Sequence, residues 1–156
     1  MAIPTVNEAN GDFTHYAIIT FEDLQRTGYL SNIGAANQVK LCSIPAGGGV
    51  VYAVAYERTA FAGATDITLD VGTTAGDPDE FIDALDVDAM SAPVANTGEE
   101  FVQSAGNTTI AGGALPVKLV QTETDVIAEI NGTHADLTAG ELFIGLKILD
   151  PSKYVK

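Results

Sequence analysis

The sequence predicts an all-β fold, an antiparallel two-sheet sandwich that is jelly-roll-like and carries one short helix. Many short segments alternate apolar with polar residues, which is the two-residue period of a strand with one buried face. The chain has 16 glycines and no tryptophan, and it is rich in small and β-branched residues, which favours strands and turns over a helical bundle. No fixed-period repeat is visible, so a solenoid or a propeller is not expected.

A sequence of 156 residues is most simply one domain. A domain of this size buries roughly 70% of its unfolded surface, which is enough for a core without disulfides or metal. We expect an N-terminal arm at residues 1–13, a β-sandwich domain at 14–150 and a C-terminal tail at 151–156. The arm has scattered apolar side chains and an Asn-Gly pair, but neither a strand period nor a helix period.

The first half of the sandwich is expected to contain four strands, at residues 15–21, 38–44, 50–59 and 66–72. A proline and three glycines follow the second strand, and they end it because proline cannot pair and glycine permits a turn. The third strand has a face of larger residues and a face of mostly small ones, which would let a second layer approach closely. The larger face holds Tyr52, Val54 and Tyr56, and the other holds Val51, Ala53, Ala55 and Glu57.

Residues 78–85 are the expected helix. Asp77 stands at the N-cap, Pro78 at the first helical position, and two acidic residues follow in the first turn. Phe81, Ile82 and Leu85 then form an apolar stripe at helical spacing. Residues 22–28 have weak helical character, but the segment is too short to predict a helix.

The second half of the sandwich is expected to contain short strands near 100–103 and at 115–121, 125–130 and 141–149. The last strand has the clearest pattern, because four aliphatic residues share one face while Phe143 and Leu149 lie on the other. These four are Leu142, Ile144, Leu146 and Ile148. Together the elements give roughly seven or eight strands joined by short turns, the pattern of a sandwich or jelly roll.

The formal net charge of −14, from 21 acidic and 7 basic residues, argues against two classes of partner. Nucleic acid and anionic membrane surfaces both need basic patches, and no two Lys or Arg residues are adjacent here. No apolar run approaches the ~20 residues of a membrane span, and no secretion signal is recognisable. Cys42 is the single cysteine and is expected to be a buried thiol. We therefore expect synthesis in a reducing cytoplasm.

A catalytic, cofactor or metal site is not expected. His15 and His134 lack a second His or Cys at ligand spacing. The acidic segment 77–88 has oxygen ligands that calcium could use, but it does not match an EF-hand and is interpreted as the solvated face of a capped helix. Glu99 and Glu100 could pair as glycosidase carboxylates, yet the aromatic content of 7% offers few sugar platforms.

Residues 59–73 read TAFAGATDITLDVGT and are followed by DPDEF at 77–81; shorter segments of note are GYL at 28–30, IPAG at 44–47 and LTAGE at 137–141. Together these segments resemble the head decoration, or capsid cement, proteins of tailed phages. The resemblance implies a non-enzymatic, β-rich virion protein, made in the host cytoplasm and often trimeric. It also implies binding to the major capsid protein at local three-fold positions of the shell, where the protein bridges neighbouring subunits.

Apolar side chains on both faces of two strands, together with those of the N-terminal arm that cannot be buried within their own segment, predict an oligomer or capsid contact. The residues assigned to this contact are Ile3, Val6, Phe13, Tyr52, Tyr56 and Phe143. The alternative function is a carbohydrate- or receptor-binding module of a phage tail or fibre, and an acid-rich enzyme on a β scaffold comes third. A binding module should expose aromatic rings in a groove, whereas a cement protein should cover them in contacts between subunits.

Overall fold

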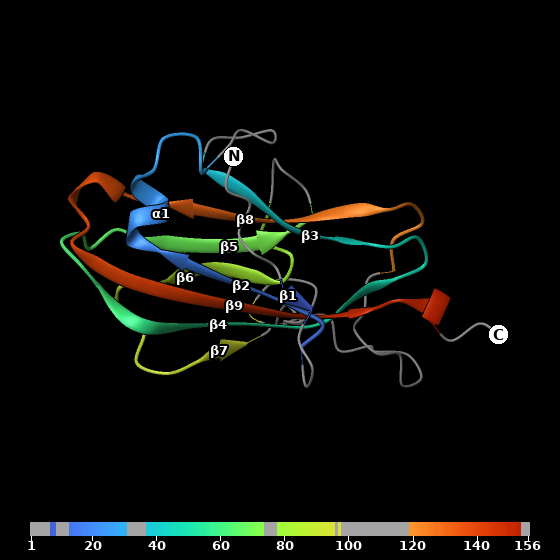
Figure 1. The fold of residues 1–156 in the computed structure, drawn as a ribbon. Coiled ribbons are helices and arrows are strands. Elements are labelled where there is room, and N and C mark those ends of the chain that lie inside the picture. Colours follow the sequence, from blue (N-terminus) through green and yellow to red (C-terminus); the bar gives the residue numbers. More distant parts are fainter. Residues whose placement is uncertain are drawn as a thin grey trace.

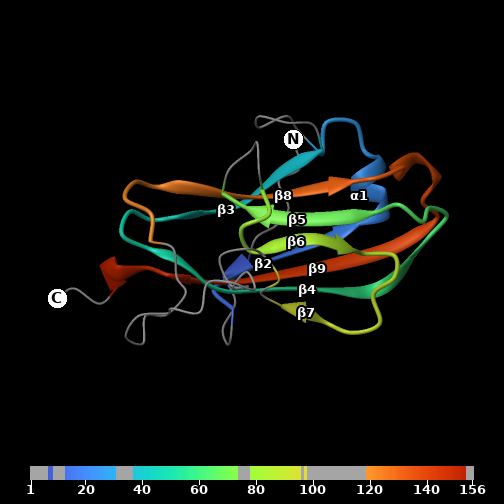
Figure 2. The same cartoon turned by 180° about the vertical axis from the view of Figure 1, so that it is seen from behind.

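Two antiparallel sheets pack face to face in the computed structural model, which describes residues 7–8, 13–30, 37–73, 78–95, 97 and 119–153 (Figure 1). The five-stranded sheet has the order β1 (Asn7–Glu8), β2 (His15–Thr20), β9 (Ala139–Leu149), β4 (Gly49–Ala62) and β7 (Val94–Ala95). The four-stranded sheet has the order β3 (Gln38–Ile44), β8 (Thr124–Asn131), β5 (Thr68–Gly72) and β6 (Ile82–Asp86). The view from behind shows the same two layers (Figure 2).

The strand pairing is that of a jelly roll. From β2 onward, the first strand pairs with the last, and the remaining strands nest inside them as β3 with β8, β4 with β7, and β5 with β6. Every one of these pairs is antiparallel. Because the nested pairs alternate between the two sheets, the chain rolls up into a sandwich. The predicted fold class is therefore confirmed.

The core lies between the sheets and follows the two-residue period. The predicted row on β9 is buried, with Leu142, Ile144 and Leu146 each 1% exposed. Ala53 and Ala55 of β4 lie opposite Leu146 and Ile144, so small side chains face large ones across the sheet. The face of small residues on β4 was predicted to include Val51. A bulge between Val50 and Tyr52 changes this, so that Val50 is buried in the core and Val51 is half-buried.

The α-helix among the described residues is α1 (Phe21–Gln25). It overlaps residues 22–28, where the sequence has weak helical character but did not predict a helix. A capping box forms it: the Thr20 side chain accepts from the Asp23 N–H, and the Asp23 carboxylate accepts from the Thr20 N–H. The side-chain amide of Gln25 then donates to three backbone carbonyls at and after the 3₁₀ turn η2 (His134–Asp136). These bonds tie the helix to the entrance of β9.

The predicted helix at 78–85 is wrong, because part of this segment forms strand β6. Ile82 pairs with Val71 and Leu85 pairs with Leu69, so the apolar stripe packs along a neighbouring strand. The Glu80 carboxylate accepts from the backbone N–H and hydroxyl of Thr73 and folds the segment back onto the end of β5. Long-range strand pairing thus outweighs the local helix signals.

An Ala84→Gly substitution will stabilise the protein by about 1 kcal/mol, since Ala84 has a φ of 44° in the left-handed region. In a helix the same change would cost about 1 kcal/mol. Urea denaturation of the two proteins measures the sign of the difference. A loss of stability would contradict the strand assignment and support the helix.

The other boundaries differ modestly from the predictions. β4 continues to Ala62, β9 starts at Ala139, and Asp66 and Ile67 precede β5. Residues 119–121 are not a strand, while the expected strand at 100–103 and residues 115–118 lie outside the described part. Within the predicted arm, Asn7–Glu8 pair with β2, and within the predicted tail Pro151–Lys153 form a 3₁₀ turn.

Candidate contact surface

Five aromatic rings gather on the outer face of the five-stranded sheet, the face turned away from the core. We call them the aromatic cluster: Phe13, Tyr16, Tyr52, Tyr56 and Phe143. Phe143 is at the centre, with ring centroids 5.7 Å from Phe13, 5.8 Å from Tyr16 and 5.3 Å from Tyr56. The Phe13 ring also stacks on Tyr52 at 6.0 Å. All five side chains are half-buried.

The register of three strands brings these rings together. Phe143 of β9 lies opposite Tyr56 of β4 on one side and Ile18 of β2 on the other. Gly145, two residues along the same face, leaves the backbone bare, and a Cβ built there would be 2.8 Å from ring carbons of Phe13 and of Phe143. The missing side chain therefore makes room for rings from its neighbours.

Four of the six predicted contact residues belong to the cluster, namely Phe13, Tyr52, Tyr56 and Phe143. Ile3 and Val6 lie outside the described residues. Tyr16 was not singled out, although the alternation of the first strand could have identified it, because Ala17 and Ile19 are buried and Tyr16 therefore points outward.

The outer face of the four-stranded sheet has the opposite character, because carboxylates replace the aromatic rings. Asp70 and Glu129 each lie between buried residues and so point outward, and Asp125 lies four residues before Glu129 on the same face of β8. Lys40 pairs with Asp125 at 2.6 Å, and the Gln38 amide donates to Glu129 at 2.6 Å. Burial raises the pKa of Asp70, and the carboxylates of Asp83, Glu129 and Asp79 add to the effect. The sandwich thus has one aromatic face and one acidic face.

Two acidic residues of the 77–88 segment accept hydrogen bonds from backbone N–H groups. The Glu80 side chain is buried at 3% exposed and accepts from Thr73, and the Asp88 carboxylate accepts from the Ile67 N–H at 2.9 Å. No group of three or more His, Cys, Asp or Glu side chains suited to a metal occurs within the described residues. The carboxylates of Glu80 and Asp88 therefore stabilise turns.

Cys42 is buried in the core, and His15 and His134 each lie near a polar side chain. Cys42 lies in the core, where burial raises the pKa of its thiol to about 12, so the nucleophilic thiolate is not formed at neutral pH. The expected buried thiol is confirmed. Burial lowers the pKa of His134, which faces the Asp66 carboxylate, and the His15 Nδ1 lies 3.0 Å from the Thr14 hydroxyl.

A small pocket of about 170 Å³ lies beside the cluster, at the edge of β4. It is lined by Tyr56 and Glu57 of that strand and by residues 90–93 of the segment that leads into β7. One ring of the cluster contributes to it. The other four rings engage each other or the sheet surface and do not form its walls.

Comparisons with known proteins give little further information. No family model matches the sequence, and no curated protein matches it. A chain of the solved "Cyanophage Pam1 capsid asymmetric unit" aligns over 94% of this chain and 89% of its own length, with 18% identity and a TM-score of 0.49. A likeness at this level carries no argument about function. Within the described residues, no helix is long and apolar enough to cross a membrane.

Proposed function

We propose that this chain is a structural, non-catalytic virion protein that decorates and stabilises a phage capsid by bridging neighbouring shell subunits. The observation that carries the proposal is the aromatic cluster on an outer sheet face. The resemblance of residues 59–73 and 137–141 to head decoration proteins supplies the class of partner, the major capsid protein. The protein acts on the capsid surface, and we propose that it does so as a trimer.

The size of the cluster fits a contact surface. Tyrosine and phenylalanine are enriched at the cores of protein interfaces, and a few such anchors carry most of the binding energy. Covering the remaining half of one large ring, roughly 100 Å², contributes about 2 kcal/mol. One copy would bind weakly after the cost of association, but a trimer that engages several equivalent sites gains affinity from its multivalency.

The acidic face lies on the opposite side of the sandwich from the aromatic cluster, where it would remain in contact with solvent. With a net charge of −14, free copies repel one another, which keeps the protein soluble before it is assembled. The described acidic face, with Asp70, Asp125 and Glu129, would point toward solvent while the aromatic cluster faces the shell or a neighbouring copy. This orientation removes the apolar rings from water and leaves the charges hydrated.

A Phe143→Ala substitution will weaken binding to phage heads depleted of this protein by about tenfold or more, because it removes the central ring of the cluster. Co-sedimentation of the purified protein with the heads measures the affinity. The matched control is Leu119→Ala, because Leu119 is a large apolar residue that is 57% exposed and lies outside the cluster. It should change the affinity less than twofold.

If Phe143→Ala and the parent protein bind the heads equally well, the aromatic cluster is not part of the contact with the capsid. A parent protein that does not bind the heads at all would overturn the proposed function. Light scattering of the free protein tests the trimer separately, since a monomer at all micromolar concentrations excludes it.

The pocket beside Tyr56 favours a second candidate function, binding of a carbohydrate or receptor by a tail or fibre module. A tyrosine ring next to the Glu57 carboxylate could stack on a sugar and accept hydrogen bonds from it. Saturable binding to a glycan array that is lost in Tyr56→Ala but kept in Phe143→Ala would support this function over capsid decoration.

A further inference from the structure

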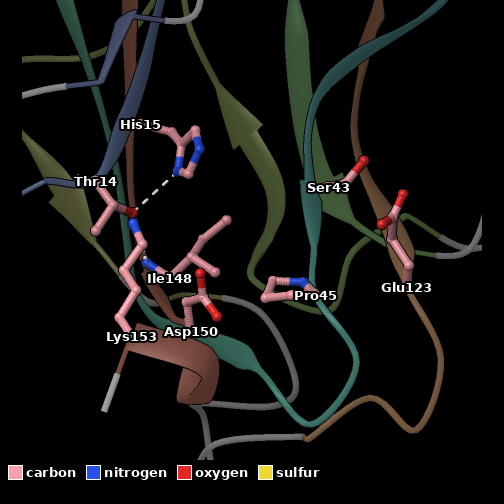
Figure 3. A pocket seen from close by; sticks show the side chains of 8 residues that line it. All are labelled: Thr14, His15, Ser43, Pro45, Glu123, Ile148, Asp150 and Lys153. Carbon is pink, nitrogen blue, oxygen red and sulfur yellow. Dashed lines mark hydrogen bonds between the residues drawn. The ribbon is translucent and has the colours of Figure 1, made fainter. Parts of the chain in front are cut away.

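A second pocket, of about 270 Å³, lies where the two sheets end (Figure 3). We call it the end pocket. Thr14, just before β2, lines it together with His15 of β2 and Ile148 of β9, and Ser43 and Glu123 line it from β3 and from the approach to β8. Asp150 and Lys153, just after β9, and Pro45, just after β3, complete the lining. None of these side chains belongs to the aromatic cluster.

The charges of the end pocket favour a cationic guest. Its lining contains two carboxylates, Glu123 and Asp150, one ammonium group, Lys153, and the imidazole of His15. Asp150 accepts hydrogen bonds from the Ser152 hydroxyl at 2.6 Å and the Ser152 N–H at 3.1 Å, and these bonds, with the Lys153 charge, hold its pKa below the usual range. Glu123 is exposed and has no hydrogen bond or ion pair in the described structure. An anion would meet more like charge than opposite charge here.

The dimensions of the end pocket favour one long side chain. Its volume of about 270 Å³ is slightly below the range of roughly 300–1,000 Å³ that holds small organic ligands. Ile148 and Pro45 provide aliphatic surface along which methylene groups can lie, and Asp150 and Glu123 place a carboxylate on either side of it (Figure 3). The planar guanidinium of arginine donates up to five hydrogen bonds and suits carboxylate and hydroxyl acceptors.

The end pocket adjoins the aromatic cluster along the chain. Phe13 belongs to the cluster and the next residue, Thr14, lines the pocket. The Thr14 hydroxyl donates to the Leu146 carbonyl at 3.2 Å and accepts from the Ile148 N–H at 2.8 Å. These bonds fix the junction between the two surfaces onto β9. A partner seated on the cluster therefore has the pocket at the border of its footprint.

We infer that the end pocket binds an arginine side chain of the partner subunit that covers the aromatic cluster. The identity of the partner rests on the proposed function. The affinity of the end pocket for a guanidinium group is independent of the proposed function. Glu123 is the main acceptor, and Asp150 adds a second negative charge. The contact supplies a charged anchor that fixes how the partner sits on the apolar rings.

A direct test uses N-acetyl-arginine amide as the probe and NMR of the full chain as the readout. The backbone amides of Ser43, Glu123 and Asp150 should shift and saturate in the millimolar range. N-acetyl-citrulline amide, which has nearly the same shape without the charge, should produce no saturable shift. Glu123→Gln should remove the response to arginine, while Asp86→Asn, which removes one exposed charge from β6, should keep it. No arginine response in the parent protein overturns the inference.

A second test compares the same variants in binding to the depleted phage heads. Glu123→Gln should weaken binding about two- to fivefold at low salt and less at high salt, and Asp86→Asn should not. If the heads bind the parent protein and both variants equally, the partner's arginine is not in the pocket, although the proposed function stands. If arginine amide binds the pocket but the heads do not bind the protein, the pocket stands and the proposed function fails.

Discussion

Replacing Gly63 by alanine will destabilise the sandwich by about 3 kcal/mol or more. Gly63 follows the end of β4 with a φ of 98°, a conformation that costs other residues roughly 1–3 kcal/mol. A Cβ built there would be 2.0 Å from the backbone oxygen of Asp136, far inside a van der Waals contact. Backbone on both sides is fixed, because the Thr138 N–H donates to the Ala62 carbonyl at 2.8 Å. The turn η2 and the start of β9 must therefore move.

Gly28 supplies the matched control for this substitution. Its φ of 82° is also in the left-handed region, but no atom lies within 4 Å of an added Cβ. Gly28→Ala should therefore lose only the conformational term, about 1–2 kcal/mol. Urea denaturation of both variants gives the two free energies of unfolding. Equal losses would show that the close approach of Gly63 to Asp136 does not constrain the fold.

Phe81→Ala will cost about 3–5 kcal/mol of unfolding free energy, the range for deleting a buried phenylalanine ring. Phe81 is 1% exposed and is among the largest fully buried side chains described. Its N–H donates to the Val71 carbonyl at 2.8 Å, so the backbone is fixed against β5 and cannot collapse easily into the space left by the ring.

Phe81→Leu is the control for this second prediction, because it keeps most of the volume and should cost less than about 2 kcal/mol. Thermal or urea unfolding measures both changes. A loss below 1 kcal/mol in Phe81→Ala would mean that the ring is not a core residue, in conflict with its burial.

Strands were predictable wherever one face is buried along the whole element. The expected strand at 38–44 matches β3, and the aliphatic row from Leu142 to Ile148 faces the core as its alternation indicates. These predictions succeed because burial of one sheet face repeats every two residues. The bulge after Val50 was not predictable, because valines occupy both positions and nothing local shows which is buried.

The segment at 78–85 shows why local signals can mislead. Pro78, the acidic first turn and the spacing of Phe81, Ile82 and Leu85 are consistent with a helix, yet the same apolar residues suit a strand. The choice depends on β5, whose Leu69 and Val71 pair with this segment. Since pairing between strands is a tertiary interaction, a single-segment pattern does not contain it.

The sequence predicted most of the residues of the aromatic cluster, but not that their side chains lie together on one sheet face. Tyr52, Tyr56 and Phe143 could each be assigned to an outward face from the alternation of their own strands. Their convergence around Gly145 depends on the register of β9 with β2 and β4, which joins residues far apart in the sequence. The end pocket was not predicted for the same reason, because Ser43, Glu123 and Asp150 meet through folding alone.

The nested pairing of the strands also sets the order of events when the chain folds. β9 lies between β2 and β4, and its partners include His15 with Leu146 and Gly49 with Leu149. The five-stranded sheet therefore cannot close during synthesis until residue 149 has left the ribosome. Topologies with such distant contacts fold in milliseconds to seconds, and until then unpaired edges of β2 and β4 are exposed. These edges make aggregation during translation a hazard for this protein, and the acidic charge of the nascent chain opposes it.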